Sequence, residues 1–194
     1  MYKKPSKTLI ILTLSLSLLH TQAIAENLAG MGETYLYKAS IAMSQGERHY
    51  YLNEALTLYN NGHYNNKTNL EYMIGLGKTY TMLDDRSNAK NILSQAYNMY
   101  PDNSNLHKAL ADFYSHFQEY NTALEFYKLA LSSGYLKDYT TNLLTAQCYE
   151  RLGDHKNAEL YYKVALMLNP NSNLAKERLN SFNNNVNCSN VIIE

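Results

Sequence analysis

The sequence has no tryptophan, only three prolines and only two cysteines among its 194 residues. Because proline interrupts helix interiors, its scarcity leaves long stretches free to form helices. Basic and acidic residues balance at 17 each, so no surplus of one sign argues for nucleic acid or a membrane surface as a partner. The length suits one domain with a real core.

Catalytic motifs are also missing. The sequence contains no H-E-x-x-H, no close Cys/His cluster, no G-x-S-x-G, no P-loop and no G-x-G-x-x-G. The histidines beyond residue 25, at 49, 63, 107, 116 and 155, are scattered along the chain. We therefore expect no enzymatic activity, no metal and no cofactor.

The N-terminus has the three parts of a secretory signal peptide. Lys3, Lys4 and Lys7 precede an apolar stretch over 9–19, and small residues stand at Ala23 and Ala25. An apolar run this short does not span a bilayer, which needs roughly 20 residues. The alternative is an uncleaved signal anchor. Since no cysteine follows the small residues, a bacterial lipid anchor is not expected.

Cleavage after Ala25 would remove three basic residues and no acidic one, which leaves a net charge of −3. The small-x-small ending suits a bacterial signal peptidase, so we expect a periplasmic protein, with secretion beyond the cell as the alternative. On a eukaryotic secretory route, Asn66 and Asn187 would be glycosylation acceptors.

Five residue columns recur every 34 or 35 residues, which is the mark of internal repeats. The apolar spacing inside each period is helical. Each period holds two helices of about 13 residues around a short polar turn, at 84–87, 118–119 and 153–154. Pro101 and Pro170 end second helices. The columns are Gly77/Ala111/Ala146, Tyr80/Tyr114/Tyr149, Ala89/Ala123/Ala158, Leu93/Tyr127/Tyr162 and Ala96/Ala130/Ala165.

These columns resemble the tetratricopeptide repeat, a 34-residue helix–turn–helix unit. The resemblance covers three units, 70–103, 104–138 and 139–172, and implies an all-α solenoid of antiparallel helix pairs in a right-handed superhelix. Two departures stand out. The family's tryptophan is replaced by Met73, His107 and Asn142, and the second unit has one extra residue within 132–134.

The flanking segments are less regular. Residues 26–69 read as a degenerate helix pair that turns at Gly46 and ends in a loop over 62–69. We expect a capping helix over 173–182, because stacked repeats need a polar terminal face. A flexible tail over 183–194 should follow.

By resemblance, the first helices of the pairs line a concave groove that binds a peptide or protein segment. The family's lysine–asparagine–arginine carboxylate clamp is not reproduced, since Ile74 and Lys78 stand at its first two positions. The implied groove residues are mixed in charge: Glu71, Ile74, Lys78, Thr81, Met82, Asn105, Lys108, Asp112, Ser115, His116, Thr140, Leu143, Gln147, Glu150 and Arg151.

Cys148 and Cys188 allow two interpretations. Cys148 is either a small packed thiol or one half of a disulfide with Cys188 that staples the tail to the last repeat. The column tyrosines are expected to pack between helices rather than contact a ligand. Among the other tyrosines, some of Tyr50, Tyr51, Tyr97, Tyr100 and Tyr161 could lie on the surface and contact a partner.

Together these features predict a noncatalytic interaction scaffold, an assembly factor for a bacterial envelope machine. The alternative is a secreted factor that acts on host or neighbouring cells through the same groove. The sequence does not name the partner, the pathway or the oligomeric state.

Overall fold

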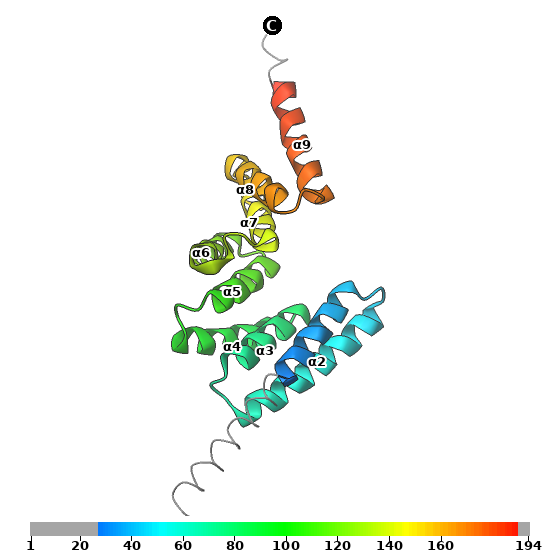
Figure 1. Ribbon diagram of the computed structural model, residues 1–194, viewed down its shortest axis with the longest axis vertical. Coiled ribbons are helices and arrows are strands. Elements are labelled where there is room, and N and C mark those ends of the chain that lie inside the picture. The colour runs from blue at the N-terminus through cyan, green and yellow to red at the C-terminus, as the bar shows by residue number, and fades with distance from the viewer. Residues whose placement is uncertain (1–26, 190–194) are drawn as a thin grey trace, which may run out of the picture. The chain divides into compact units, whose positions relative to one another are not determined.

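The computed structural model describes residues 27–189, with side chains as far as residue 182. Every regular element in this range is a helix (Figure 1), which confirms the predicted all-α fold. The chain divides into two compact units, one up to Ile92 and one from Leu93, and the boundary lies inside α4 (Arg86–Met99). The predicted signal peptide and residues 190–194 lie outside the described residues.

The first unit contains a helix over 27–41, α2 (Gln45–Asn65), α3 (Leu70–Met82) and the start of α4. Its core is built around Tyr59 of α2, which is 1% exposed. Gly32 and Gly75 leave space for this ring, because a Cβ atom on either glycine would overlap it. The two glycines therefore allow the helix over 27–41 and α3 to approach Tyr59 closely.

The predicted turn at Gly46 is wrong: the helix break covers 42–44, and Gly46 is already helical. The reason is a cap at Ser44, whose hydroxyl accepts a hydrogen bond from Glu47 N (3.1 Å). The Glu47 carboxylate in turn accepts from Met43 N (3.3 Å). This reciprocal pattern is close to a capping box, which the Ser-x-x-Glu spacing could have indicated.

Two other helices are longer than predicted. Because α2 continues to Asn65, the loop before α3 covers only 66–69 and not 62–69. Likewise α9 spans Asn173–Ser189, beyond the expected end at 182. No proline or glycine interrupts either the end of α2 after Gly62 or the whole of α9.

The second unit contains the end of α4 and five further α-helices with a π-helical turn, η1, between the second and third. Their bounds are α5 (Ser104–His116), α6 (Tyr120–Ala130), η1 (Leu131–Tyr135), α7 (Tyr139–Arg151), α8 (His155–Leu168) and α9. Small residues let the helices approach, as the repeat columns predict. The core comprises Ala111, Ala123, Leu124, Tyr127, Ala146, Cys148, Tyr149, Ala158, Tyr162 and Ala175.

The N-caps of the first helices repeat at the period of the sequence. Asn69, Asn103 and Asp138 each accept a hydrogen bond from the backbone N–H three residues later, and Ser172 does the same at the start of α9. These bonds satisfy amide groups that a helix start leaves unpaired. Ser172 stands 34 residues after Asp138, so α9 begins where the first helix of a further unit is expected.

The turns inside the helix pairs share one backbone conformation. Asp84, Gln118 and Gly153 have φ angles of 60°, 64° and 77°. Each stands one repeat from the next, so the left-handed residue is a fixed part of the turn. The extra residue predicted within 132–134 falls in η1, where Gly134 has a φ of 154°. A π-helical turn is the usual way for a helix to hold an inserted residue.

The residues that replace the family's tryptophan are all buried. Met73 is apolar, but His107 and Asn142 use their polar atoms to hold the preceding loop. His107 Nε2 lies 2.6 Å from the carbonyl oxygen of Pro101, and Asn142 Nδ2 donates to that of Leu136 (3.0 Å). In both cases the acceptor is six residues earlier, so the substitution ties the inter-repeat loop to the core.

Candidate binding site

The second unit contains a cavity of about 630 Å³, here called the α7 cavity. Residues from α5 and α7, from the start of α6, from α8 and from α9 converge on it. Most of its lining is polar, in contrast with the apolar core beside it. The lining residues are Ser115, Tyr120, Gln147, Cys148, Glu150, Arg151, His155, Tyr162 and Arg178.

Glu150 is held in this cavity by two neighbours. The Tyr162 hydroxyl donates to its Oε2 atom (2.6 Å). On the other side, Arg178 Nη1 lies 3.5 Å from its Oε1 atom. Since α7, α8 and α9 each contribute one member, the contact joins three helices, and the Arg178 guanidinium compensates the charge of Glu150.

The same combination of tyrosine, carboxylate and cation occurs at Tyr127, in the same repeat column as Tyr162, and at Tyr59, which stands 34 residues before Leu93 and so extends this column into the first unit. In α5 and α6, Asp112 accepts from the Tyr127 hydroxyl (2.7 Å) and from Lys108 Nζ (2.6 Å). The first unit has the third case, in which Tyr59 and Lys78 both contact Oε1 of Glu33. The distances there are 3.2 Å and 2.8 Å.

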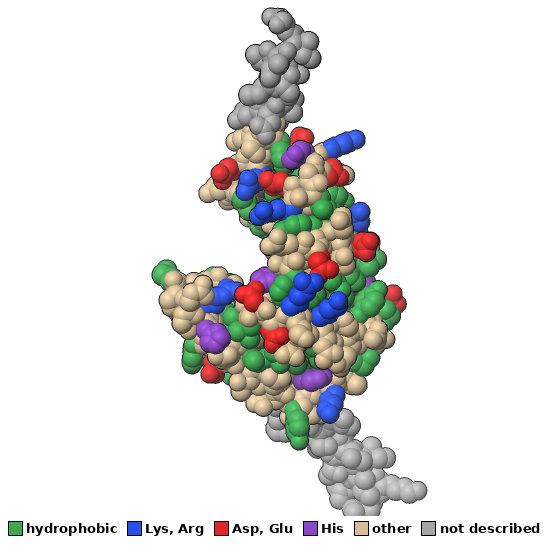
Figure 2. All heavy atoms as spheres, turned by 180° about the vertical axis from the view of Figure 1, so that it is seen from behind, with side chains coloured by type: hydrophobic (Ala, Val, Ile, Leu, Met, Phe, Trp, Pro, Cys, Tyr) green, Lys and Arg blue, Asp and Glu red, His purple; other side chains and the backbone are tan. Residues whose placement is uncertain are grey.

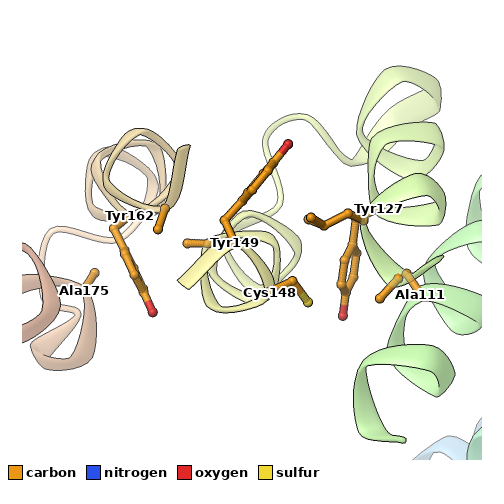
Figure 3. Packing of buried hydrophobic residues seen from close by; sticks show 10 residues of the cluster. Ala111, Tyr127, Cys148, Tyr149, Tyr162 and Ala175 are labelled. Carbon is orange, nitrogen blue, oxygen red and sulfur yellow. The ribbon is translucent and has the colours of Figure 1, made fainter. Parts of the chain in front are cut away.

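Figure 3 shows how these tyrosines are oriented in the second unit. The hydroxyls of Tyr127 and Tyr162 point to the same side, and that of Tyr149 points to the opposite side. Tyr149 instead stacks on Tyr161, with ring centroids 5.5 Å apart. Tyr127 and Tyr162, which share one repeat column, therefore direct their hydroxyls to the side that contains Asp112 and Glu150. Tyr149, which belongs to another column, packs on the opposite side.

Burial raises the pKa of the three column tyrosines well above the ordinary value of 10, and the neighbouring carboxylates raise it further. The carboxylates are Glu33 for Tyr59, Asp112 for Tyr127 and Glu150 for Tyr162. Each phenol therefore stays protonated and acts as a hydrogen-bond donor at neutral pH.

Cys148 is fully buried, and its Sγ atom lies 3.4 Å from Ser115 Oγ. Burial raises the pKa of this thiol, an effect that the Ser115 hydrogen bond partly offsets. Cys148 is a free thiol in the structure. The side chain of Cys188 lies outside the described residues, so the disulfide between the two stays a prediction.

The groove residues predicted in the first unit differ widely in exposure. Ile74 and Thr81 are buried, and Thr81 donates to the carbonyl oxygen of Gly77 (2.7 Å), so neither is presented to a partner. Lys78 is engaged by Glu33, whereas Glu71 is exposed. Met82 lines a separate cavity of about 490 Å³ at the end of α3.

In that cavity the structure assigns Arg48 a capping role. Its guanidinium donates to the carbonyl oxygens of Ala39 and Met82, each at 3.3 Å. Arg48 thereby satisfies carbonyl groups at the ends of two helices of the first unit.

Four of the ten groove residues predicted in the second unit line the α7 cavity: Ser115, Gln147, Glu150 and Arg151. Lys108 and Asp112 pair with each other, and Leu143 packs against the core. Asn105, His116 and Thr140 are exposed. Asn105 accepts a hydrogen bond from the Tyr135 hydroxyl (2.7 Å).

Sequence reasoning missed four residues of the cavity wall, Tyr120, His155, Tyr162 and Arg178, and considered Cys148 only as a packed thiol or as half of a disulfide. The sequence predicts only a core position for Tyr162, although its hydroxyl reaches the cavity. Arg178 belongs to α9, for which the sequence predicts only a capping role. The N-cap at Ser172, in register with Asp138, is the signal that could have identified α9 as a further first helix.

Other kinds of site find little support in the part of the chain that the structure describes. No group of three or more His, Cys, Asp or Glu side chains there could hold a metal ion. Among the described helices, none has the length and apolar character needed to cross a membrane. Figure 2 shows basic and acidic side chains interspersed with apolar ones on the face that it presents.

Comparison with known proteins agrees with this architecture. Residues 140–172 match the family model of a tetratricopeptide repeat. None of the curated proteins matches the chain.

Solved structures also resemble the chain. A tetratricopeptide repeat protein of Thermus thermophilus is 20% identical with a TM-score of 0.63, over 80% of this chain and 79% of that one. A crystal structure of MamA is 18% identical with a TM-score of 0.59, over 72% of this chain and 82% of that one. At such identities the likeness shows the fold alone.

Proposed function

We propose that the chain is a noncatalytic scaffold of the tetratricopeptide repeat kind, which binds a segment of a partner protein in the α7 cavity. The observation that supports this proposal most is the cavity itself. Polar side chains from five helices converge there beside an apolar core, and its volume of about 630 Å³ suits a few residues of a bound segment.

The second support is the way in which the cavity wall is held. Tyr162 and Arg178 fix Glu150 from two directions, and Tyr162 is locked by complete burial. A wall with fixed side chains loses little conformational entropy when a partner binds. Preorganisation of this kind suits recognition of a protein segment.

Arg151→Glu is the variant that tests the site. Arg151 is exposed on the cavity wall, so the change should leave helicity intact and reverse one charge of the site. Affinity capture with crosslinking from the native compartment, followed by mass identification, should yield at least about tenfold less of the specific partner. Lys78 is left unchanged, because its substitution would also break the Lys78–Glu33 ion pair.

The matched control is Lys176→Glu, which reverses an exposed charge on α9 outside the cavity without breaking an ion pair among the described side chains. It should capture the partner as well as the unchanged chain does. If Arg151→Glu captures the partner equally well, the binding site lies on another face.

For cellular location, we propose export to a bacterial periplasm and a role there in assembling an envelope machine. The support is the signal-peptide pattern at 1–25, followed by repeats without catalytic motifs. Secretion as a factor that acts on other cells is the second candidate, since it needs the same leader. Recovery of the protein mainly from the culture supernatant of intact cells would contradict the periplasmic assignment.

A further inference from the structure

The charges of the α7 cavity do not balance, and this imbalance indicates the chemistry of the bound segment. Its charged wall has two guanidinium groups, Arg151 and Arg178, and one carboxylate, Glu150, with the imidazole of His155 beside them. Arg178 and Glu150 pair with each other. The positive charge of Arg151 is left without a counterpart in the wall.

Glu150 has little capacity to neutralise Arg151 as well. Its Oε2 atom accepts from Tyr162 at 2.6 Å, and its Oε1 atom faces Arg178. Within the described side chains, Arg151 itself pairs with no carboxylate. An exposed guanidinium in a concave wall offers several N–H donors in a planar fork, which matches a carboxylate of a ligand.

The neutral members of the wall suit the same ligand. Gln147, one helical turn before Arg151, and the Tyr120 hydroxyl can donate to carboxylate or peptide carbonyl oxygens. The concave wall strengthens the attraction, because the surrounding protein partly excludes solvent.

On the premise that the proposed scaffold function holds, we infer that the α7 cavity binds an acidic segment of a partner protein. An Asp or Glu side chain of that segment contacts Arg151, and the Tyr162–Glu150–Arg178 contact positions the wall behind it. The ligand group is an internal side chain, since a cavity of this size has room for the chain on both sides of it.

A random 12-residue peptide library, displayed as N-terminal fusions so that no peptide has a free C-terminus, tests the inference on the full chain. Peptides retained by the unchanged chain should contain about twice the Asp and Glu content of the input library. That enrichment should disappear with Arg151→Gln and persist with Lys176→Gln, which removes an exposed charge outside the cavity.

A retained peptide, labelled with fluorescein, then gives the size of the effect. Its dissociation constant should rise about tenfold or more for Arg151→Gln, as expected for loss of a charge-assisted hydrogen bond. Millimolar inorganic phosphate should not displace it. Full displacement by phosphate would overturn the inference in favour of a site for small anions.

Three further outcomes would also overturn it: retained peptides without acidic enrichment, enrichment that survives Arg151→Gln, and no retained peptides at all. Each is distinguishable from failure of the proposed function. If a partner protein is still captured from the native compartment, the scaffold function stands and only the acidic chemistry is wrong. If no partner is captured either, both proposals fail.

Discussion

At the residue scale, the most consistent device in the molecule is a buried tyrosine whose hydroxyl donates to a carboxylate that also contacts a cation. Tyr59, Tyr127 and Tyr162 all do this, and all three are at most 1% exposed. The rings fill space between helices, and each hydroxyl donates a hydrogen bond to a carboxylate on the polar side. At the corresponding position of the remaining repeat, Leu93 is fully buried and fills the same space, but it has no hydroxyl to donate.

The Tyr162→Phe variant measures how much the hydrogen bond from Tyr162 to Glu150 contributes to stability. It keeps the ring but removes the donor to Glu150, a partly buried carboxylate, so the free energy of unfolding should fall by about 1–2 kcal/mol. Urea titration followed by circular dichroism measures the change. Tyr161→Phe is the control, because Tyr161 contributes ring stacking on Tyr149, and it should alter stability by less than about 0.5 kcal/mol.

The raised tyrosine pKa values also predict how stability depends on pH. In the unfolded chain a phenol loses its proton near pH 10, whereas in the folded chain Tyr59, Tyr127 and Tyr162 keep it to higher pH. The folded state then binds more protons, so stability falls as pH rises above 10. The slope should reach about 1.4 kcal/mol per pH unit for each such tyrosine.

Urea titrations at pH 9, 10 and 11 test this expectation. Tyr162→Phe cannot lose a proton at that position, so its stability should fall less steeply, and its deficit against the unchanged chain should narrow above pH 10. Equal slopes for the two proteins would contradict the assignment of Tyr162 to this effect.

At the element scale, the spacing between helices is set by small residues facing large rings. Gly32 and Gly75 face Tyr59 in the first unit, and Gly62 faces the ring of Tyr72. In the second unit the alanine columns do the same for Tyr127 and Tyr162. A helix interior tolerates the conformational cost of glycine where packing returns more free energy.

Gly75→Ala should therefore be destabilising although alanine favours helices. The new methyl group would overlap the Tyr59 ring, and such overpacking lowers the free energy of unfolding by about 1–3 kcal/mol. Gly30→Ala is the matched control, because nothing lies within 4 Å of a Cβ atom there. The control should raise the free energy of unfolding by up to about 1 kcal/mol. Denaturant unfolding of both variants measures these changes.

At the scale of the whole molecule, a repeat stack leaves its last apolar face uncovered unless a final helix packs on it. Here α9 has this role in the second unit. Ala175 is fully buried in the core, and Leu179 and Phe182 pack against it. Ser172 adds a link to α7, since its hydroxyl lies 2.8 Å from that of Tyr139.

Removing residues 173–194 should consequently uncover Tyr162 and its neighbours. We expect a loss of about 3–5 kcal/mol in the free energy of unfolding, together with aggregation of the truncated chain. Thermal unfolding and size-exclusion chromatography measure both effects. Removing only 190–194 is the control, and if it destabilises the chain as much as the longer truncation does, the packing of α9 is not the cause.

Much of the fold could be predicted from the sequence, because its signals are local. The turn at Gly153-Asp154 and the stops at Pro101 and Pro170 depend on residues a few positions apart. The alanine columns are informative for a related reason, since a period of 34 or 35 residues marks the same place in each unit. The missed cap at Ser44 was equally local, and its Ser-x-x-Glu signal was present.

The sequence by itself thus determined the all-α repeat, its units and the core positions of Tyr127 and Tyr162. Only the tertiary structure decided which carboxylate each hydroxyl reaches. Asp112 stands nine residues after its helix cap at Asn103, whereas Glu150 stands twelve after Asp138, so no fixed repeat position marks the acceptor. The physical reason is that local bonds depend on backbone geometry, which every repeat shares. The α7 cavity and the unpaired charge of Arg151 instead depend on how side chains from five helices meet, and that differs from one repeat to the next.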